Sequence, residues 1–568
     1  MVKKLDSILY YGLMVLAFVI PISIAATNVV WAILLLVWII KIILKKSEDF
    51  SIPLIYPIFI FLLVTIISSF FGLNFSNSIK GLNSELLFIV FFIIAVNVKD
   101  FEHVKKIVYF FLISSALTGI LGLWQYFSGN NIWDNVAYGK TASLLSMFNF
   151  RAHGTRSWMH TYAEGLLMAL PIAIYFSLNS RKKIFYYLII GLIISGIVLS
   201  YVRMVWLTTF VIFGIMFFTQ FKILKNINFI WFGIILILII SSSFFLPKRA
   251  NIIKRATDFR DPIRINMWKT SFAIFKDYPL FGTGMKNIKT VYPGYYEKLN
   301  LPKEHYKLSH LHSTFIHLLT ERGIFGLLAF LNLFVFYFYY GIRKAKYVSG
   351  LERFFISGCL LGIPGFLLSG LTEYTYGDSE VRMTALFLMA LTFYKSRVVF
   401  FDRDGTIIED SHYLSKVKDL KVFEKSAQAI GLLNKSGYKV IIVTNQSGIG
   451  RGYYSRKDAD EVNKELKKRL NENYAHIDNI YVCPHHPDDN CSCRKPKPGM
   501  LIRAKKDLNI DLKNSYIVGD KQCDIDLAKS INAKSIFVLS GQGKDVKGAD
   551  YTAKDILAAA EWIIKNEN

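Results

Sequence analysis

Two aspartates follow a short apolar segment in the last third of the chain. Residues 398–401 read Val-Val-Phe-Phe, which predicts a buried strand, and Asp402-Arg403-Asp404-Gly405-Thr406 follows directly. A carboxylate at the end of a strand can attack phosphorus and form an aspartyl-phosphate. A second carboxylate two residues later can give a proton to the leaving oxygen and afterwards activate water. The pair Asp402 and Asp404 therefore indicates phosphoryl-group chemistry.

Three further segments carry polar residues next to predicted strands or in a basic loop. They are the predicted strand 438–443 with Thr444 and Asn445 behind it, the run Arg494-Lys495-Pro496-Lys497-Pro498-Gly499, and the predicted strand 516–519 with Asp520 and Asp524 behind it. The carboxyl ends of parallel strands are where α/β folds place their sites. These side chains are therefore expected to belong to one site.

The five cysteines are unevenly spread. Cys483, Cys491 and Cys493 fall within eleven residues, beside His485 and His486, whereas Cys359 and Cys523 lie apart. Three thiolates and one imidazole can close a tetrahedral zinc shell, and a closed shell implies a structural metal that folds its loop. The spacing favours a metal site over a set of disulfides.

In this order the four polar segments resemble the haloacid dehalogenase superfamily of phosphatases, over residues 398–568. The resemblance implies a Rossmann-like α/β domain, over residues 397–568. It implies that Asp402 is the nucleophile and Asp404 the acid/base, and that Thr444 and Lys495 bind phosphoryl oxygens. It also implies Mg²⁺, which offsets charge in phosphoryl transfer. The implied metal-site residues are Asp402, Asp520 and the Asp404 carbonyl, with Asp524 orienting the metal shell and Asn445 as a substrate-binding neighbour.

The cysteine segment narrows this resemblance. Cys-Pro-His-His followed by Cys-x-Cys-Arg-Lys-Pro-Lys-Pro-Gly resembles the branch that contains heptose bisphosphate 7-phosphatase and histidinol-phosphatase. The implied zinc loop spans residues 483–493, and Arg494 is expected to meet a second anionic group of the substrate. Histidinol phosphate stays open as a substrate beside D-glycero-D-manno-heptose 1,7-bisphosphate. The implied zinc ligands are Cys483, His485, Cys491 and Cys493, with His486 as a weaker alternative to His485.

The first part of the chain has a different character. The chain as a whole is 53% hydrophobic and 15% aromatic, and apolar runs of membrane-spanning length lie within residues 1–395. They predict an all-α polytopic membrane domain of about twelve transmembrane helices, over residues 1–396. Basic residues fall on alternate short loops, so the positive-inside rule places that side, both termini and the domain at 397–568 in the cytoplasm.

Two predicted outer loops are long, residues 128–161 and about 247–314, and the second is strongly basic. A basic outer loop can face anionic lipid headgroups or bind a polyanionic substrate, and composition alone leaves both open. Arg151, Arg156 and His160 in the first loop are weaker site candidates, since solvation alone accounts for them.

Three short motifs favour the substrate interpretation. They are Ser200-Tyr-Val-Arg203-Met-Val-Trp206, the pair Arg264-Ile-Asn-Met-Trp268 and Tyr278-Pro-Leu-Phe-Gly-Thr-Gly284, and His312-Ser313 followed by nine residues and Gly323-Ile-Phe-Gly326. Each alone has a structural explanation, such as a snorkelling arginine. As an ordered set they resemble the O-antigen ligase and polymerase family of bacterial envelope proteins, over most of residues 1–395.

That family moves a glycan from a polyprenyl diphosphate to an acceptor hydroxyl at the periplasmic face of the inner membrane. The resemblance implies that Arg203 and Arg264 hold the diphosphate, since arginine binds such oxygens in bidentate fashion and stays charged. It implies that His312 lies near the reacting centre as the base for the acceptor proton. No metal is expected for this step.

Together the two resemblances predict a bifunctional, multi-pass protein of the bacterial inner membrane. It would ligate O-antigen to lipid A–core on the periplasmic side and dephosphorylate heptose 1,7-bisphosphate in the cytoplasm. Expected partners are the polyprenyl-diphosphate-linked glycan, the lipid A–core acceptor, heptose bisphosphate and the bilayer, without nucleic acid. For the membrane part, an O-antigen polymerase and a non-catalytic anchor stay open. A transporter would show intramembrane charges and repeated halves, and the sequence shows neither clearly.

Overall fold

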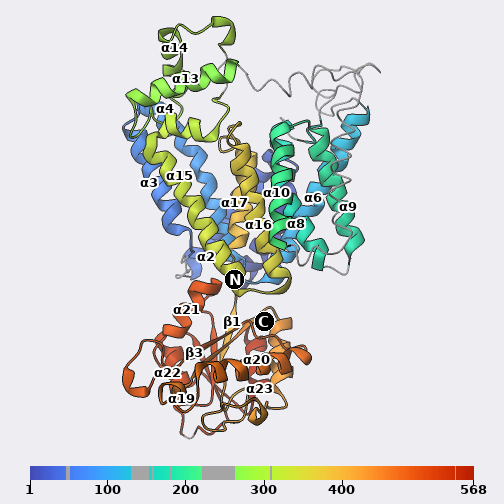
Figure 1. Cartoon of the computed structure of the whole chain (residues 1–568), viewed down its shortest axis with the longest axis vertical. Coiled ribbons are helices and arrows are strands. Elements are labelled where there is room, and N and C mark those ends of the chain that lie inside the picture. Colours follow the sequence, from blue (N-terminus) through green and yellow to red (C-terminus); the bar gives the residue numbers. More distant parts are fainter. Residues whose placement is uncertain are drawn as a thin grey trace. The chain divides into compact units, whose positions relative to one another are not determined.

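The computed structural model describes residues 1–45, 52–128, 152–155, 159–179, 182–220, 262–306, 310–543 and 545–567. The chain forms two compact units. The first comprises Met1–Asn97, Lys105–Ile342 and Gly350–Phe393, and the second comprises Val98–Val104, Arg343–Ser349 and Tyr394–Asn568. The first is helical, and the second contains a sheet with helices around it (Figure 1).

The helices of the first unit are α1 (Val2–Val19), α2 (Ile24–Lys45), α3 (Ile55–Phe70), α4 (Phe75–Leu82), η1 (Asn83–Leu87), α5 (Phe88–Asn97), α6 (Phe101–Ser128), α8 (Met159–Asn179), α9 (Lys183–Leu199), α10 (Arg203–Gln220), α13 (Pro262–Asp277), α14 (Ile288–Lys298), η4 (Lys303–His305), α15 (Thr314–Tyr347), α16 (Gly350–Ser369) and α17 (Ser379–Thr392). Helices α13 and α14 lie beyond the ends of the long helices of this unit (Figure 1).

Within the described ranges, six helical stretches are long and apolar enough to cross a membrane. They are Ile24–Leu44, Phe75–Asn97, Phe101–Ser128, Met159–Leu178, Thr314–Tyr347 and Gly350–Ser369. Three shorter apolar helices are Ile55–Phe70, Lys183–Leu199 and Arg203–Met216. The number of about twelve spans and the topology stay predictions. The candidates Arg151 and Arg156, and residues 247–261 and 307–309 of the basic loop, lie outside the described residues.

Glycines allow α16 to pack closely on α8. A Cβ at Gly358 would lie 2.9 Å from Ile172 Cα, and a Cβ at Gly362 would lie 2.8 Å from the carbonyl oxygen of Met168. Small residues four positions apart let two helix backbones approach where lipid provides no hydrophobic driving force. This spacing explains the close pairing of α8 and α16.

Buried charges join three elements of the first unit. Arg322 on α15 is 1% exposed and donates to Glu85 Oε1 at 2.8 Å. Arg382 on α17 lies 3.5 Å from the same oxygen, and the Tyr376 hydroxyl donates to Glu85 Oε2 at 2.5 Å. Glu85 and Arg322 lie within two of the helical stretches that could cross a membrane, and the sequence did not make these charges evident. They were missed because the three charged residues lie far apart in the sequence.

The second unit contains a six-stranded parallel sheet in the order β3-β2-β1-β4-β5-β6. Its strands are β1 (Val398–Phe401), β2 (Lys439–Asn445), β3 (Asn479–Cys483), β4 (Tyr516–Gly519), β5 (Lys534–Val538) and β6 (Tyr551–Ala553). Its helices are η5 (Val417–Asp419), α18 (Ser426–Lys435), α19 (Ser447–Gly450), α20 (Arg456–Glu472), η6 (Pro487–Asp489), α21 (Gly499–Leu508), α22 (Gln522–Ser530) and α23 (Ile556–Glu567).

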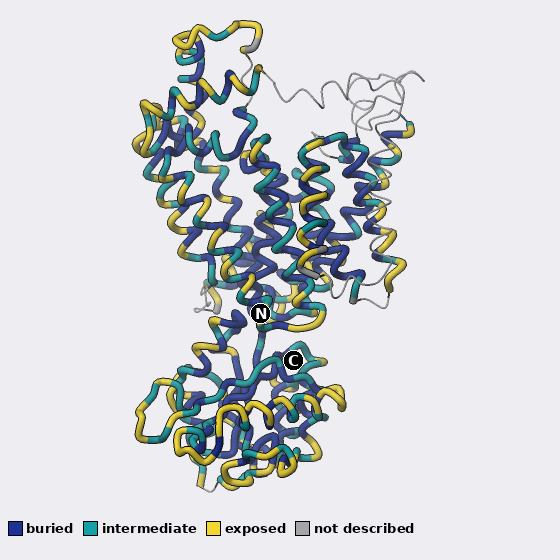
Figure 2. The backbone as a smooth tube through the Cα atoms, in the orientation of Figure 1, coloured by how far each residue is buried: buried dark blue, intermediate teal, exposed yellow. Residues whose placement is uncertain are grey.

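The central strands of this sheet are buried (Figure 2), and because successive side chains point to opposite faces, both faces are covered. All four residues of β1 are fully buried, which is why the segment reads as a continuous apolar run. Alternate residues of β1, including Val399 and Phe401, share one core with α18, α20 and α23. Strand β1 pairs with β2 on one side and with β4 on the other. The chain builds the sheet outward from β1 through β2 and β3, and then in the opposite direction through β4, β5 and β6, so the strand order reverses at β1. Such a switch point is where open parallel sheets place their sites.

Candidate active sites

A buried lysine and three carboxylates meet at the switch point of the second unit. Asp402 follows β1, Asp520 follows β4, and Lys495 precedes α21. Lys495 Nζ lies 2.8 Å from Asp402 Oδ1 and 2.6 Å from Asp524 Oδ1. The predicted nucleophile, a predicted phosphate-binding lysine and two predicted metal-site aspartates thus occupy one place.

The carboxylates fit a divalent cation. Asp402, Asp520 and Asp524 each offer a ligand atom, and these atoms lie within 4.8 Å of one another. Asp520 Oδ1 is buried and has no hydrogen-bond partner among the described residues. An oxygen-rich site with an orphaned carboxylate oxygen suits Mg²⁺. Gly405 permits this approach, because its φ is +83° and a Cβ there would lie 2.4 Å from Asp520 Oδ2.

Burial sets the electrostatics of this cluster. It raises the pKa of Asp402 to about 6, against the lowering charge of Lys495 and together with the raising charge of Asp524. Burial and the charge of Asp402 also raise the pKa of Asp520. The ammonium of Lys495 is disfavoured by burial, but Asp402 and Asp524 raise its pKa above the ordinary value. The site therefore has a deficit of positive charge that a bound cation would relieve.

The predicted acid/base lies beside β2. Thr444 Oγ1 donates to Asp404 Oδ2 at 3.3 Å, and Gln446 Nε2 donates to the same oxygen at 2.8 Å. Gln446 was missed by sequence analysis, because no motif marks it. The side-chain amide of Asn445 makes two hydrogen bonds to the backbone of Lys495. Asn445 Nδ2 donates to the Lys495 carbonyl at 3.3 Å, and the Lys495 N–H donates to Asn445 Oδ1 at 3.0 Å. Its contact is thus to the lysine loop, whereas a role in substrate binding stays a prediction.

Arg494 presents an unsatisfied donor beside this site. Its Nη1 is buried and has no hydrogen-bond partner among the described residues. The next residue is Lys495, whose ammonium reaches Asp402. A guanidinium nitrogen without a protein acceptor suits an anionic group of a substrate.

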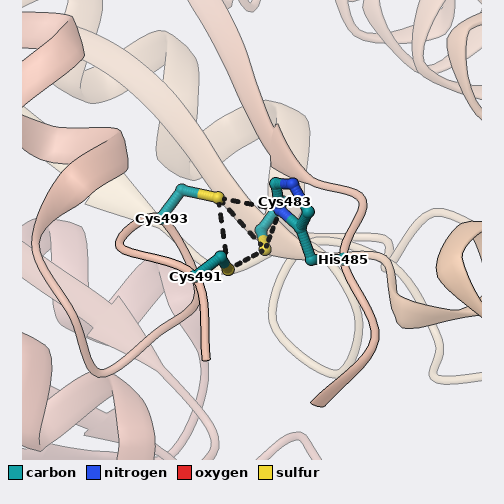
Figure 3. A group of neighbouring side chains, drawn as sticks. All are labelled: Cys483, His485, Cys491 and Cys493. Atoms are coloured by element: carbon teal, nitrogen blue, oxygen red, sulfur yellow. Dashed lines mark hydrogen bonds between the residues drawn. The ribbon is translucent and has the colours of Figure 1, made fainter. Parts of the chain in front are cut away.

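The cysteine segment forms a second candidate metal site (Figure 3). Cys493 Sγ lies 3.4 Å from Cys483 Sγ, 3.5 Å from Cys491 Sγ and 3.2 Å from His485 Nδ1. A zinc–sulfur bond of about 2.3 Å in a tetrahedron separates two sulfurs by about 3.8 Å, so the observed spacing fits zinc. His486 Nδ1 instead accepts from the Asp488 N–H at 3.3 Å, which favours His485 as the fourth ligand.

In the first unit, one carboxylate joins two of the predicted residues. Arg264 Nη2 donates to Glu373 Oε1 at 2.7 Å, and His312 Nδ1 lies 3.1 Å from Glu373 Oε2. His310 and His160 lie 3.8 and 3.9 Å from the same carboxylate. Sequence analysis missed Glu373 and His310. We call these five residues the Glu373 cluster.

Arg203 begins α10 and is exposed, and its role in binding the diphosphate stays a prediction. His312 has a left-handed backbone, with φ +47°. Such a conformation is uncommon for histidine and is typical of functional sites that the surrounding structure holds in place.

The glycine-rich motifs of the first unit bind each other. The Ile324 N–H donates to the Pro279 carbonyl at 2.9 Å, and the Gly284 N–H donates to the Glu321 carbonyl at 2.9 Å. Gly323 has φ 66° and ψ −169°, which interrupts α15. A Cβ at Gly323 would lie 2.2 Å from the Leu280 carbonyl oxygen. These glycines therefore join the loop after α13 to the interrupted helix that follows His312.

Both parts of the chain are similar to known protein families. Residues 187–331 match the O-antigen ligase family model, and residues 492–560 match a haloacid dehalogenase-like hydrolase model. D-glycero-beta-D-manno-heptose-1,7-bisphosphate 7-phosphatase of Haemophilus ducreyi is 39% identical over 160 residues, which cover 27% of this chain and 88% of that protein. The chain joins an O-antigen ligase-family domain to a heptose bisphosphate phosphatase-family domain.

Two further relatives belong to the same phosphatase family. D-glycero-alpha-D-manno-heptose-1,7-bisphosphate 7-phosphatase of Photorhabdus laumondii is 41% identical over 138 residues, which cover 23% of this chain and 75% of that protein. The crystal structure of D,D-heptose 1,7-bisphosphate phosphatase from B. bronchiseptica, complexed with magnesium and phosphate, is 28% identical. It covers 30% of this chain and 99% of that chain with a TM-score of 0.29. The two family models and the Haemophilus ducreyi relative confirm the predicted membership of both families.

Proposed function

We propose that the phosphatase-family domain removes the C7 phosphate of D-glycero-D-manno-heptose 1,7-bisphosphate. The observation that carries this proposal is the contact of Lys495 with Asp402 at the carboxyl end of β1. It places a charged donor beside a strand-end carboxylate, as phosphoryl transfer through an aspartyl-phosphate requires. The names of the two phosphatase relatives supply the substrate class.

The reaction has two displacements at phosphorus. An Asp402 oxygen attacks phosphorus, the bond from phosphorus to the C7 oxygen breaks, and Asp404 gives its proton to that oxygen. Water then attacks the aspartyl-phosphate and gives a proton to Asp404, which releases phosphate and restores the Asp402 carboxylate. Lys495 and Thr444 bind the phosphoryl oxygens. Mg²⁺, held by Asp402, Asp520 and the Asp404 carbonyl, would offset charge on the phosphoryl group.

The second phosphate distinguishes the candidate substrates. Heptose 1,7-bisphosphate carries another anion at C1, whereas histidinol phosphate carries a cationic amine. The buried, unpartnered Nη1 of Arg494 favours an anion over a cation. We therefore prefer the heptose substrate. The four-residue cysteine and histidine site would hold zinc as a structural ion beside Arg494.

Phosphate release by the full chain in detergent tests the phosphatase proposal. Segments 98–104 and 343–349 belong to the same compact unit as the sheet, so the full chain is the appropriate material. With Mg²⁺ and heptose 1,7-bisphosphate we expect release of one phosphate per substrate, abolished by EDTA and by Asp402→Asn. Release at an unchanged rate by Asp402→Asn would contradict the proposed nucleophile.

We further propose that the ligase-family domain transfers a glycan from a polyprenyl diphosphate to lipid A–core. The Glu373 cluster supports this, because Arg264 can bind diphosphate oxygens while Glu373 holds Nδ1 of His312. That arrangement leaves Nε2 of His312 to accept the acceptor's proton. In this proposal the protein spans the bacterial inner membrane, the cluster faces the periplasm, and both termini and the phosphatase domain are cytoplasmic.

A gene deletion tests the membrane proposal and separates its alternatives. Uncapped core in the deletion strain supports a ligase, whereas core capped by single repeat units indicates a polymerase. Complementation with Arg264→Ala or His312→Ala should fail at a normal protein level. Full complementation by both variants would instead support a non-catalytic anchor.

A further inference from the structure

A buried arginine holds the predicted acid/base of the phosphatase domain. Arg403 lies between Asp402 and Asp404 in the sequence, and its side chain is 0% exposed. Its Nε donates to Asp404 Oδ2 at 3.2 Å, and its Nη2 donates to Asp404 Oδ1 at 3.0 Å. Two parallel bonds from one guanidinium fix the plane of a carboxylate as well as its position.

The other end of this guanidinium is fixed by α20. Arg403 Nη1 donates to Asn463 Oδ1 at 3.0 Å, and Asn463 is itself buried. Helix α20 begins with a capping box formed by Ser455 and Asp458, which defines its start. A helix outside the reaction centre therefore sets the place of the arginine, and the arginine sets the place of Asp404.

Two side chains that follow β2 in the sequence also hold the carboxylate of Asp404. Gln446 Nε2 donates to Asp404 Oδ2, and the Tyr454 hydroxyl donates to Gln446 Oε1 at 2.6 Å. Gln446 and Tyr454 are both buried. Among the residues that the structure describes, only Arg403 donates to both oxygens of Asp404. Arg403 can therefore control the direction in which Asp404 presents its proton.

We propose that Arg403 is the positioning residue for Asp404, with Asn463 as its anchor. This inference rests on the proposed phosphatase reaction and assigns a task to a residue that does not itself meet the substrate. A buried arginine could instead serve only the fold, with Asp404 as a convenient acceptor. The two roles differ in what they predict for substrates with different leaving groups.

The leaving group separates positioning from folding. The C7 oxygen of heptose needs a proton from Asp404 when its bond to phosphorus breaks, whereas nitrophenolate leaves without one. Hydrolysis of the aspartyl-phosphate needs Asp404 as base with either substrate. Misplacement of Asp404 should therefore slow both steps with heptose bisphosphate but only the second step with p-nitrophenyl phosphate.

The test uses full-length protein in detergent with Mg²⁺. For Arg403→Met we expect kcat with heptose 1,7-bisphosphate to fall by about a hundredfold, with little change in KM. With p-nitrophenyl phosphate the same variant should give a burst of nitrophenol and accumulate phosphorylated protein beyond the wild-type level. Asp404→Asn should show the same burst. Arg403→Lys, which keeps the charge but cannot bond both oxygens in parallel, should recover part of kcat.

Two further variants keep the inference open to refutation if Arg403→Met unfolds. Asn463→Ala leaves Arg403 in place and should produce a smaller burst and a smaller loss of kcat. Arg469 lies on the same helix and donates to Glu465 and to the Leu420 carbonyl. Arg469→Lys is the control and should leave the activity on both substrates unchanged. Equal losses with both substrates and no burst in folded Arg403 and Asn463 variants would overturn the positioning role. Wild-type activity on p-nitrophenyl phosphate alone would refute the proposed substrate, while the burst would still test Arg403.

Discussion

Arg264 and Glu373 form a 2.7 Å ion pair although they lie 109 residues apart. Burial opposes the charge of Glu373, but hydrogen bonds from His310 and His312 and the charges of His160 and Arg264 lower its pKa below the ordinary range. Glu373 therefore stays ionised at the pH of any bacterial envelope. It can hold an arginine and a histidine in fixed positions at the same time.

Glu373→Gln should reduce glycan transfer by about a hundredfold, because His312 loses its ionised partner and Arg264 loses its charge pair. Glu373→Asp should retain part of the activity. The ratio of capped to uncapped core in a complemented deletion strain measures the effect. Glu297→Gln, at an exposed position on α14, is the control and should behave as wild type. Normal capping by Glu373→Gln at equal protein level would exclude a role for the carboxylate.

Gly323→Ala should destabilise the ligase-family domain. Alanine is strained at φ 66° and ψ −169°, a region that glycine alone readily adopts, by about 1–3 kcal/mol, and its Cβ would also meet the Leu280 carbonyl oxygen at 2.2 Å. We expect a lower protein level and a lower melting temperature in detergent. Gly294→Ala on α14 is the matched control, because no atom lies within 4 Å of its added Cβ. Equal melting temperatures for the two variants would show that the joined loop contributes nothing to stability.

When Mg²⁺ is removed, Asp402 should make the phosphatase domain less stable at neutral pH than at mildly acidic pH. Burial raises its folded pKa to about 6, while an unfolded aspartate titrates near about 3.9. Between these values the folded state binds more protons, so the free energy of unfolding falls as pH rises, by about 3 kcal/mol in total. Urea unfolding in EDTA, at about pH 5 and about pH 7.5, should show the part of this loss that falls in that window, about 1.4 kcal/mol. Asp402→Asn should show a smaller one, and an identical pH dependence in both proteins would contradict the expectation.

Cys493→Ser should remove bound zinc and most phosphatase activity. Cys493 lies two residues before Lys495, so loss of the ion frees the loop that carries the phosphate-binding lysine. Zinc per chain, measured by atomic emission, should fall from about one to near zero, as expected for a closed site. Cys359→Ser, in the ligase-family domain, should retain the ion. Full zinc content in Cys493→Ser would contradict the proposed ligand set.

The phosphatase site was largely predictable from sequence, because its residues directly follow apolar strands. Val398–Phe401 marks β1, and the parallel arrangement then brings Asp402 to Asp520 without further information. Gln446 and Asn463 were not predictable, since a polar residue behind a strand or on a helix gives no sign of the carboxylate or guanidinium that it bonds. Arg403 also gave no sign, because a charged residue between two aspartates reads as a solvated position.

The ligase-family site was predictable only in part. Arg264 and His312 lie in recognisable motifs, but Glu373 lies in a short connection after α16 that has no such pattern. The buried charges Glu85, Arg322 and Arg382 were also missed, since they lie far apart in the sequence and meet only through helix packing. The glycines of residues 278–284 and 323–326 were identified, but their contact with each other required the structure.

Substrate choice by the phosphatase domain tests the central claim most directly. We would measure kcat/KM of the full chain for both anomers of heptose 1,7-bisphosphate and for histidinol phosphate, and follow the products by phosphorus NMR. The account predicts loss of the C7 phosphate with the C1 phosphate intact. It also predicts a preference of about tenfold to a hundredfold for the bisphosphate, the value of one charged hydrogen bond from Arg494. Faster hydrolysis of histidinol phosphate, or release of the C1 phosphate, would contradict it.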